Sequence, residues 1–160
     1  MEDTVLVQIG DMKVGQGNQI LITYALGSCV GISFYDPLLK LGALLHVLLP
    51  AKGGNRDVNP MKYADSGIHE TLQELTRKGF CKNRAIVKMA GGAKMFGDDG
   101  NLSLGMIGDR NVYSARQTLA REGLWIAAED VGGVSARTMS LDLRNGDVSV
   151  RAAGREQIHL

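Results

Sequence analysis

The chain has little of several things that would assign it to a class at once. Its 160 residues include only two cysteines, three prolines and one tryptophan. Two cysteines cannot form the disulfide framework of a small secreted domain, and no apolar run reaches the ~18 residues of a membrane span. The N-terminus, MEDTVLVQIG, lacks the basic, apolar and small-residue layout of a signal peptide. We therefore expect a cytoplasmic protein with free thiols.

The chain also lacks an excess of charge of either sign. Eighteen basic residues face seventeen acidic ones, which leaves a formal charge of +1. That balance gives no long-range attraction to nucleic acid or to an anionic membrane, so we expect neither nucleic-acid binding nor membrane insertion. The length suits a single domain, residues 1–160, that buries roughly two-thirds of its unfolded surface.

Short apolar and β-branched runs are what the chain does have. They predict strands over 4–9, 19–25, 30–35, 41–49, 84–92 and 124–130, with residues 13–19 as a loop. Asp36-Pro37 favours a turn between the third and fourth of these. Asn145-Gly146 predicts a hairpin within 137–154, and this dipeptide is the strongest short-range hairpin signal in the sequence.

Two segments have helical periodicity. Asn59-Pro60 is a helix-start signature, and the apolar spacing after it predicts a helix that runs to Gly79. Asp109 is predicted to cap a second helix that ends at Gly123. About seven strands and two long helices are typical of an α+β fold, with helices packed on a largely antiparallel sheet or sheet pair.

Cys29 and His46 are the first candidates for chemistry. Cys29 precedes one strand of the predicted hairpin, and His46 lies late in the other, opposite roughly residue 30. An imidazole at that position can reach the thiol, lower its pKa from ~8.5 and hold the thiolate. From these residues alone, a small buried thiol and a hydrogen-bonded core histidine are the commoner arrangement.

Two neighbouring features could complete such a site. Thr23 comes six residues before Cys29 on the neighbouring strand, where its hydroxyl could orient the imidazole, and no Asp or Glu is better placed. Gly27 and Ser28 could aim backbone N–H groups at a developing oxyanion. Thr23 is equally an ordinary β-branched strand residue, and Gly27 equally only a turn.

The other candidates carry weaker patterns. Cys81 has no placed partner and is expected to be structural, His69 to be solvated on its helix, and His159 to lie in the tail. The cysteines and histidines lack zinc-finger spacing, and AGGAKMFGDDG has no Gly-Lys-Ser/Thr ending of a phosphate loop. The sequence thus predicts no metal and no cofactor.

Six short motifs occur in one order along the chain: TYALGSCVGISFYDP, GALLHVLLP, NPMKYAD, AGGAKMF, IGDRN and AEDVGG. In that order and spacing the chain resembles the CheD family of chemoreceptor glutamine deamidases, from about Leu6 to Val150. The resemblance implies a Cys–His–Thr triad of Cys29, His46 and Thr23. It also implies a layered α/β sandwich similar to the catalytic domain of cytotoxic necrotizing factor toxins.

The resemblance also implies an activity and partners. They would be hydrolysis of glutamine side chains on methyl-accepting chemotaxis receptors, for which we expect a cysteine thioester and no cofactor, and binding of the phosphatase CheC. A non-catalytic regulator of CheC is the first alternative, and a cysteine amidase or peptidase of unrelated substrate is the second. Gly91–Gly92 and Gly132–Gly133 are candidates for the substrate rim, or simply turns.

One difference from the family pattern falls beside Cys29. Family members often read Leu-Gly-Leu-Gly-Ser-Cys, whereas this chain has Tyr24 and Ala25 in place of the first Leu-Gly. Alanine tolerates fewer backbone conformations than glycine, so the local shape depends on what Ala25 must adopt.

Overall fold

The protein has three layers, two of sheet and one of helix. The computed structural model describes residues 3–54, 59–95 and 106–160. Within them, the "central sheet" has the order β2 (Asp11–Gln16), β5 (Leu41–Val47), β4 (Val30–Asp36), β6 (Ile86–Gly91) and β7 (Ile126–Val131). The "outer sheet" has the order β1 (Asp3–Leu6), β3 (Gln19–Leu26), β8 (Arg137–Asp142), β9 (Asp147–Ala152) and β10 (Ile158–His159).

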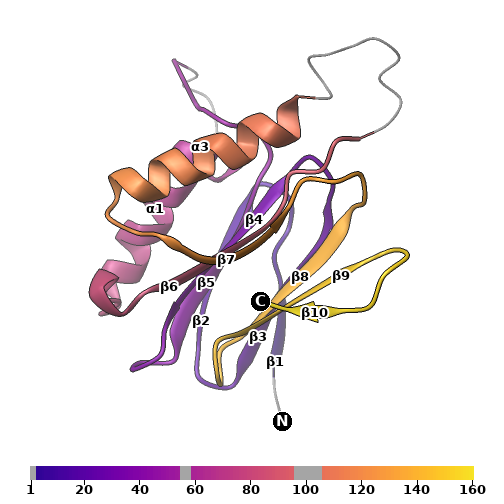
Figure 1. Ribbon diagram of the computed structural model, residues 1–160. Coiled ribbons are helices and arrows are strands. Elements are labelled where there is room, and N and C mark those ends of the chain that lie inside the picture. Colours follow the sequence, from indigo (N-terminus) through magenta and orange to yellow (C-terminus); the bar gives the residue numbers. More distant parts are fainter. Residues whose placement is uncertain (1–2, 55–58, 96–105) are drawn as a thin grey trace.

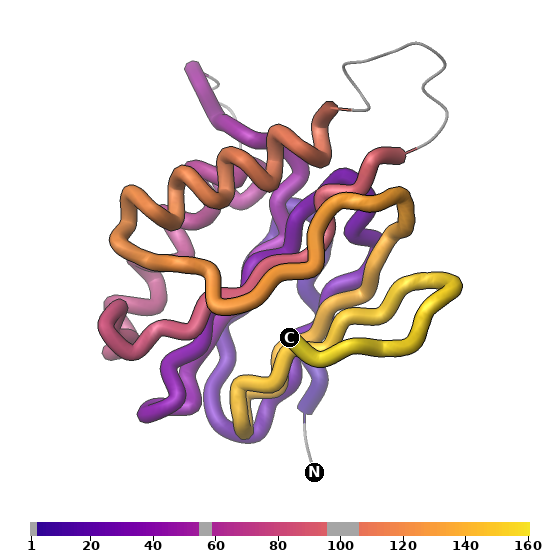
Figure 2. Tube along the Cα trace, in the orientation of Figure 1, coloured from indigo at the N-terminus to yellow at the C-terminus, as the bar shows by residue number. Residues whose placement is uncertain are grey.

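Two helices cover one face of the central sheet, and the outer sheet covers its other face (Figure 1). They are α1 (Ala64–Arg77) and α3 (Ile107–Arg121), with short 3-10 turns η1 (Pro60–Lys62) and η2 (Lys82–Arg84). The predicted α+β class is confirmed, and both sheets are mostly antiparallel. The parallel pairs are β1–β3 and β6–β7, and the latter two run side by side in Figure 2. None of the described helices is long and apolar enough to cross a membrane.

The β4–β5 hairpin is the middle of the molecule. The predicted hairpin across Asp36-Pro37 is confirmed, and every residue of both strands is buried. Because successive side chains of a strand point to opposite faces, the hairpin serves two cores. Ile32 and Phe34 pack beneath the helices, whereas Tyr35 and Leu44 pack against the outer sheet.

The helix starts differ from the predicted ones. Asn59 does cap a helical turn, because its side chain accepts from the Met61 N–H at 3.0 Å, but that turn is η1. Tyr63 then adopts an extended backbone and α1 begins at Ala64. The prediction that Asp109 caps the second helix was wrong, since α3 has Met106 at its N-cap and Asp109 in its first turn. Gly108, in the first turn of α3, packs closely against the backbone of residues 92 and 93.

Two strands of the structure were not predicted. Residues 13–19 were expected to be a loop, yet β2 runs from Asp11 to Gln16 as the edge strand paired with β5. Its polar and glycine-rich sequence hides the strand, because an edge strand needs little apolar surface. β10 is also an edge strand and has only two residues, and β1 ends at Leu6 instead of residue 9.

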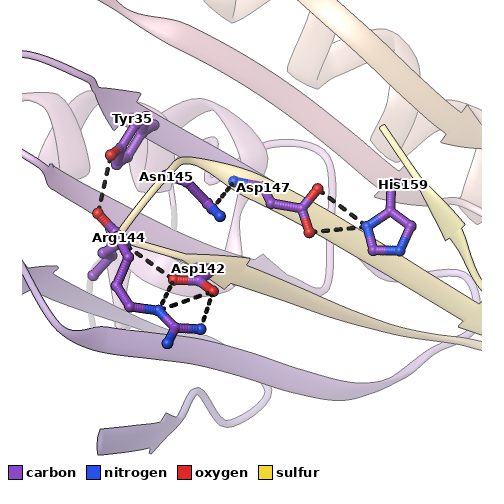
Figure 3. Close-up of polar contacts among 7 residues, drawn as sticks. Tyr35, Asp142, Arg144, Asn145, Asp147 and His159 are labelled. Carbon is purple, nitrogen blue, oxygen red and sulfur yellow. Dashed lines mark hydrogen bonds and ion pairs between the residues drawn. The ribbon is translucent and has the colours of Figure 1, made fainter. Parts of the chain in front are cut away.

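The predicted turn at Asn145-Gly146 is confirmed between β8 and β9. The Asn145 side chain accepts from the Asp147 N–H at 2.9 Å, and Asp147 in turn contacts His159 (Figure 3). Gly146 has φ +80°, and a Cβ there would lie 2.5 Å from the Tyr35 ring. The Tyr35 hydroxyl donates to the Leu143 carbonyl at 2.9 Å, so this turn is tied to the central sheet (Figure 3).

Candidate functional site

Cys29 lies at the end of a short loop, residues 27–29, between β3 and β4. The loop follows an irregularity in the β3–β8 pairing, where two residues, Tyr24 and Ala25, are left out of register. Ala25 has φ +61°, a left-handed conformation that is rare for alanine. The Cys29 side chain is 6% exposed and belongs to the core between the two sheets. The thiol is therefore at the inner edge of the sandwich.

His46 lies on the same face of the central sheet as Cys29. It pairs with Gly31, one residue along from the predicted register. Directly opposite residues share a face, and Cys29 precedes Gly31 by two, so Cys29 is the diagonal neighbour of His46. Gly31 contributes no side chain between them. The sequence-based expectation that the hairpin brings thiol and imidazole onto one face is thus met by the strand register.

Thr23 contacts His46 from the other sheet. The sequence predicted it on a neighbouring strand, but β3 belongs to the outer sheet and faces β5 across the core. The Thr23 hydroxyl lies 2.7 Å from His46 Nδ1 and donates its hydrogen to the Val7 carbonyl, also at 2.7 Å. A hydroxyl has one hydrogen to give, so its oxygen accepts the Nδ1–H of the imidazole. This assigns the proton to Nδ1 and leaves Nε2 with a free lone pair.

Burial keeps the histidine neutral. His46 is fully buried, and desolvation lowers its pKa to about 4. Its Nε2 has no hydrogen-bond partner in the part of the chain that the structure describes. An unpaired nitrogen in a core is unfavourable for folding, so its presence calls for a functional explanation. Here the free atom is the one able to accept a proton.

The same burial acts on the thiol. Desolvation raises the pKa of Cys29, and the backbone N–H of Cys29 itself opposes this to a smaller extent. The expectation that a neighbouring imidazole lowers the thiol pKa was wrong in direction, because the desolvation of both groups disfavours charge on either. At neutral pH the pair is therefore a thiol and an imidazole, each uncharged.

A carboxylate also faces His46 from the neighbouring strand β2. Asp11 on β2 is directly opposite His46, a neighbour that sequence reasoning missed together with the strand. Its carboxylate contacts Lys13 at 3.2 Å and accepts from the Gln8 N–H at 3.5 Å. The imidazole is thus oriented by Thr23 and not by an acid.

All three carbonyls of the 27–29 loop are held by donors. Gly27 accepts from the Ala93 N–H at 2.8 Å and Cys29 from the Gly92 N–H at 2.8 Å. Ser28 accepts from the Asn111 side chain at 2.9 Å. In a trans peptide the C=O and the following N–H point in opposite directions, so these bonds also aim the N–H groups.

The N–H groups of the loop divide into two kinds. The Gly27 N–H donates to the Ala25 carbonyl at 3.0 Å, so it is not available for an oxyanion as the sequence had allowed. The Ser28 N–H has no acceptor among the residues that the structure describes, and the Cys29 N–H interacts with its own sulfur. Two adjacent N–H groups that bond to no carbonyl, beside a thiol, are the elements of an oxyanion hole.

The glycine pairs expected at the rim have different positions. Gly91 and Gly92 pack directly against the Cys29 backbone, where a Cβ on Gly91 would collide with the Cys29 carbonyl. They support the loop. Gly132 and Gly133 line a cavity of about 310 Å³ with Lys94, Asp109 and Val134. The last five residues of AGGAKMFGDDG, from residue 96 on, lie outside the described residues.

The remaining candidates lie apart from this site. The Cys81 N–H donates to Asp36, a buried carboxylate whose pKa is lowered chiefly by its hydrogen bonds from Arg84. His69 is exposed on α1 and lies 3.3 Å from Glu122, as the expected solvated position. No group of three metal-binding side chains occurs within the ranges that the structure describes.

Sequence reasoning missed one buried polar residue of the site. Asn111 on α3 is fully buried, and its Nδ2 donates to the carbonyls of both Ser28 and Leu48, at 2.9 and 3.0 Å. It belongs to the motif IGDRN, which was noted only for its resemblance. An asparagine on the apolar face of a helix was the signal that could have pointed to it, because buried amides require partners.

Known proteins are similar to this chain over most of its length. The model of the CheD family, described as CheD chemotactic sensory transduction, matches residues 48–152. A Pyrococcus horikoshii protein named "Probable chemoreceptor glutamine deamidase CheD" is 47% identical over 149 residues, which cover 92% of this chain and 91% of that protein. A protein of the same name from Symbiobacterium thermophilum is 40% identical over 157 residues, 96% of this chain and 95% of its own.

Among solved structures, a Neisseria meningitidis protein of the DUF152 family superposes with a TM-score of 0.48 at 11% identity, over 82% of this chain and 63% of that one. The family model covers well over half of the chain, and the relatives align over more than nine-tenths of it. The chain belongs to the CheD family.

Proposed function

We propose that this protein is a protein-glutamine deamidase that converts glutamine side chains of methyl-accepting chemotaxis receptors to glutamate, with Cys29 as nucleophile. The names of its relatives support the reaction and the substrate class. The observation that carries the proposal is the Thr23–His46 hydrogen bond, which leaves a neutral imidazole with its Nε2 unpaired on the face shared with Cys29.

The first half of the reaction forms a thioester. As the Cys29 sulfur attacks the carboxamide carbon, the thiol proton passes to His46 Nε2, because neither group is charged beforehand. The carbonyl oxygen becomes an oxyanion, which the N–H groups of Ser28 and Cys29 stabilise. His46 then returns the proton to the amide nitrogen, the C–N bond breaks, and ammonia leaves.

The second half restores the thiol. A water molecule attacks the γ-glutamyl thioester while His46 Nε2 takes one of its protons. The C–S bond breaks, the sulfur recovers that proton from His46, and the side chain departs as a carboxylic acid that ionises to glutamate. The balance is one amide and one water in, one carboxylate and one ammonium out, with no metal or organic cofactor. Throughout, Thr23 keeps the imidazole in one tautomer.

The test is deamidation of a chemoreceptor. The purified protein is incubated with the cytoplasmic helical domain of a receptor from the same cell, and peptide mass spectrometry locates glutamines converted to glutamate. We expect conversion at defined sites, none with Cys29→Ala, and normal conversion with Cys81→Ala as the matched thiol control. Equal conversion by the Cys29→Ala variant would overturn the nucleophile, and no conversion by the unaltered protein would overturn the reaction.

The same assay distinguishes the two alternatives. A regulator without catalysis would bind a CheC-type phosphatase tightly and convert no glutamine, whereas a general cysteine amidase would act on free glutamine peptides as well as on the receptor. We propose that CheC binding accompanies catalysis, and a pull-down with the Cys29→Ala variant tests whether it is independent of the chemistry. The likeness to cytotoxic necrotizing factor catalytic domains also stays a prediction, which direct superposition checks.

A further inference from the structure

Asn111 occupies an unusual position for an amide. It is fully buried on the inner face of α3, and both hydrogens of its Nδ2 are used: one on the Ser28 carbonyl at 2.9 Å, the other on the Leu48 carbonyl at 3.0 Å. These carbonyls come from two different segments. Ser28 immediately precedes the nucleophile, and Leu48 follows His46 by two residues at the end of β5.

The acceptor side of the same amide is unused. Asn111 Oδ1 is buried and has no hydrogen-bond partner among the residues that the structure describes. Rotating the amide would place this oxygen against the two carbonyl oxygens, so the two donors determine its orientation. A buried polar atom without a partner is unfavourable for folding. The amide is therefore retained for what its nitrogen holds.

We propose that Asn111 is a positioning residue of the catalytic site, which fixes the distance between the Cys29 loop and the His46 strand. This rests on the deamidase mechanism proposed above. By holding the Ser28 carbonyl, Asn111 also fixes the peptide plane whose other end is the Cys29 N–H, so one side chain sets both the nucleophile and an oxyanion donor. It touches neither substrate nor reacting atoms.

Ser114 supplies a matched control. It lies one helical turn beyond Asn111 on α3, and its hydroxyl donates to the Pro50 carbonyl at 2.6 Å. The Ser114 bond ties the helix to the segment after β5, but it does not reach the Cys29 loop. Ser114→Ala and Asn111→Ala thus each remove a helix-to-loop tether, and only the second removes one at the nucleophile.

The experiment measures deamidation and the reactivity of the Cys29 thiol in the full-length protein. For Asn111→Ala we expect kcat to fall roughly 10- to 100-fold with KM within about two-fold, because misplacement affects the reacting groups more than substrate binding. Iodoacetamide labelling of Cys29, followed by mass spectrometry across a pH range, should approach the profile of His46→Ala. Ser114→Ala should match the unaltered protein in both measurements.

A double substitution decides whether Asn111 acts through the pair. In a His46→Ala background, adding Asn111→Ala should change the Cys29 labelling rate by less than about two-fold, because the alignment it maintains no longer matters. Thermal unfolding is measured for each variant. If Asn111→Ala is poorly folded, Asn111→Asp takes its place, because it keeps the shape of the side chain but replaces the two N–H donors with an oxygen.

Three results would overturn the proposal: additive effects in the double variant, a kcat equal to that of Ser114→Ala, or loss of folding in both Asn111 variants. The last would make the amide structural. A failure of the deamidase proposal is distinguishable, because in that case Cys29→Ala leaves conversion unchanged or the unaltered protein converts nothing, whatever the labelling of Cys29 shows.

Discussion

The two faces of the β4–β5 hairpin have opposite characters. On the face under α1 and α3, the buried side chains are apolar except for Asp36 at the end of β4, and Ile32, Phe34 and Leu45 are among them. On the face toward the outer sheet, the same two strands carry Ser33 and His46, and Cys29 lies at the end of that face. Both faces are equally inaccessible to water, so exposure does not distinguish them.

What distinguishes them is how their polar atoms are satisfied. On the outer-sheet face Ser33 donates to the Lys88 carbonyl at 3.3 Å, and Thr23 joins His46 Nδ1 to the Val7 carbonyl. Among the described residues of this face, the His46 Nε2 is the buried polar side-chain atom left without a partner. Both faces of the hairpin therefore stabilise the fold through their cores, and the outer-sheet face also contains an atom that is unfavourable for folding and available for chemistry. The predictions below separate those two contributions.

The largest difference is expected from substitutions made on the two faces of the hairpin. His46→Gln keeps a group that can hydrogen-bond Thr23 but has no basic nitrogen, so we expect deamidation to fall roughly 10²- to 10⁴-fold. Ile32→Val on the opposite face should lower the free energy of unfolding by roughly 0.5–1.5 kcal/mol and leave kcat unchanged. Receptor deamidation and urea unfolding measure both. A kcat loss in Ile32→Val comparable to that of His46→Gln would abolish the distinction between the faces.

The pH dependence of stability isolates the imidazole. The folded protein holds His46 neutral with a pKa of about 4, below the ~6.5 of an unfolded chain. Between these values the unfolded state binds the extra proton, so the free energy of unfolding should fall by about 3 kcal/mol as pH drops from 6.5 to 4. Above pH 6.5 this contribution is complete and constant.

His46→Gln is the reference for that titration. Carboxylates such as Asp36 and Asp130, whose pKa values arginine partners lower, titrate alike in both proteins, so their effect cancels in the difference. Urea unfolding at half-unit pH steps should show the histidine component only in the unaltered protein. Parallel curves for the two proteins would mean that His46 is not held neutral by the fold.

A smaller effect is expected at Thr23. Thr23→Val keeps the shape but removes the hydroxyl, so the Nδ1–H of His46 and the Val7 carbonyl both lose their partner. Because the imidazole can then change tautomer, we expect on the order of a 10-fold loss of kcat, together with a loss of roughly 1–3 kcal/mol in stability. Thr23→Ser retains the hydroxyl and should restore most of both. If valine and serine behave alike, the hydroxyl does not orient the imidazole.

Some of the strands and turns could be predicted from the sequence and others could not, and particular residues explain the difference. The β4–β5 hairpin was predictable because two apolar runs flank Asp36-Pro37, and the β8–β9 turn because Asn145-Gly146 suits φ above zero. β2 was not, since its alternation is limited to Met12 and Val14 and ends at Gly15, which is too short to distinguish a strand from a loop. Missing it also hid Asp11 opposite His46.

The candidate site also has residues that the sequence could predict and residues that it could not. Residues that chain proximity brings together, Cys29 and His46, could be paired by counting along one hairpin. Thr23 was named for the right contact but on the wrong sheet, because sheet membership is decided by long-range pairing with β8. Asn111 could be noticed as an amide on the apolar face of a helix, but its two acceptors could not be named, since they are 83 and 63 residues away in sequence. Nor does a sequence reveal that burial raises the pKa of the thiol.

The smallest predicted effect concerns the loop that joins the two faces. Ala25, at φ +61°, sits at the irregularity between Thr23 and Leu26, and its side chain is exposed. An L-residue pays roughly 1 kcal/mol for this conformation, whereas glycine adopts it freely. Ala25→Gly should therefore raise the free energy of unfolding by about 0.5–1 kcal/mol, measured by urea unfolding.

A second alanine gives the opposite sign. Ala127 is also exposed and lies at an irregularity, the register shift between β6 and β7, but its φ is not in the left-handed region, so glycine there adds only flexibility to the unfolded chain. Ala127→Gly should thus lower stability by roughly 0.5–1 kcal/mol. If both glycine variants are destabilised, the loop before Cys29 is not strained at Ala25. If the two stability changes differ in sign, the backbone at Ala25 is strained. A change in the kcat of Ala25→Gly would then show that this strain affects the position of the Cys29 thiol.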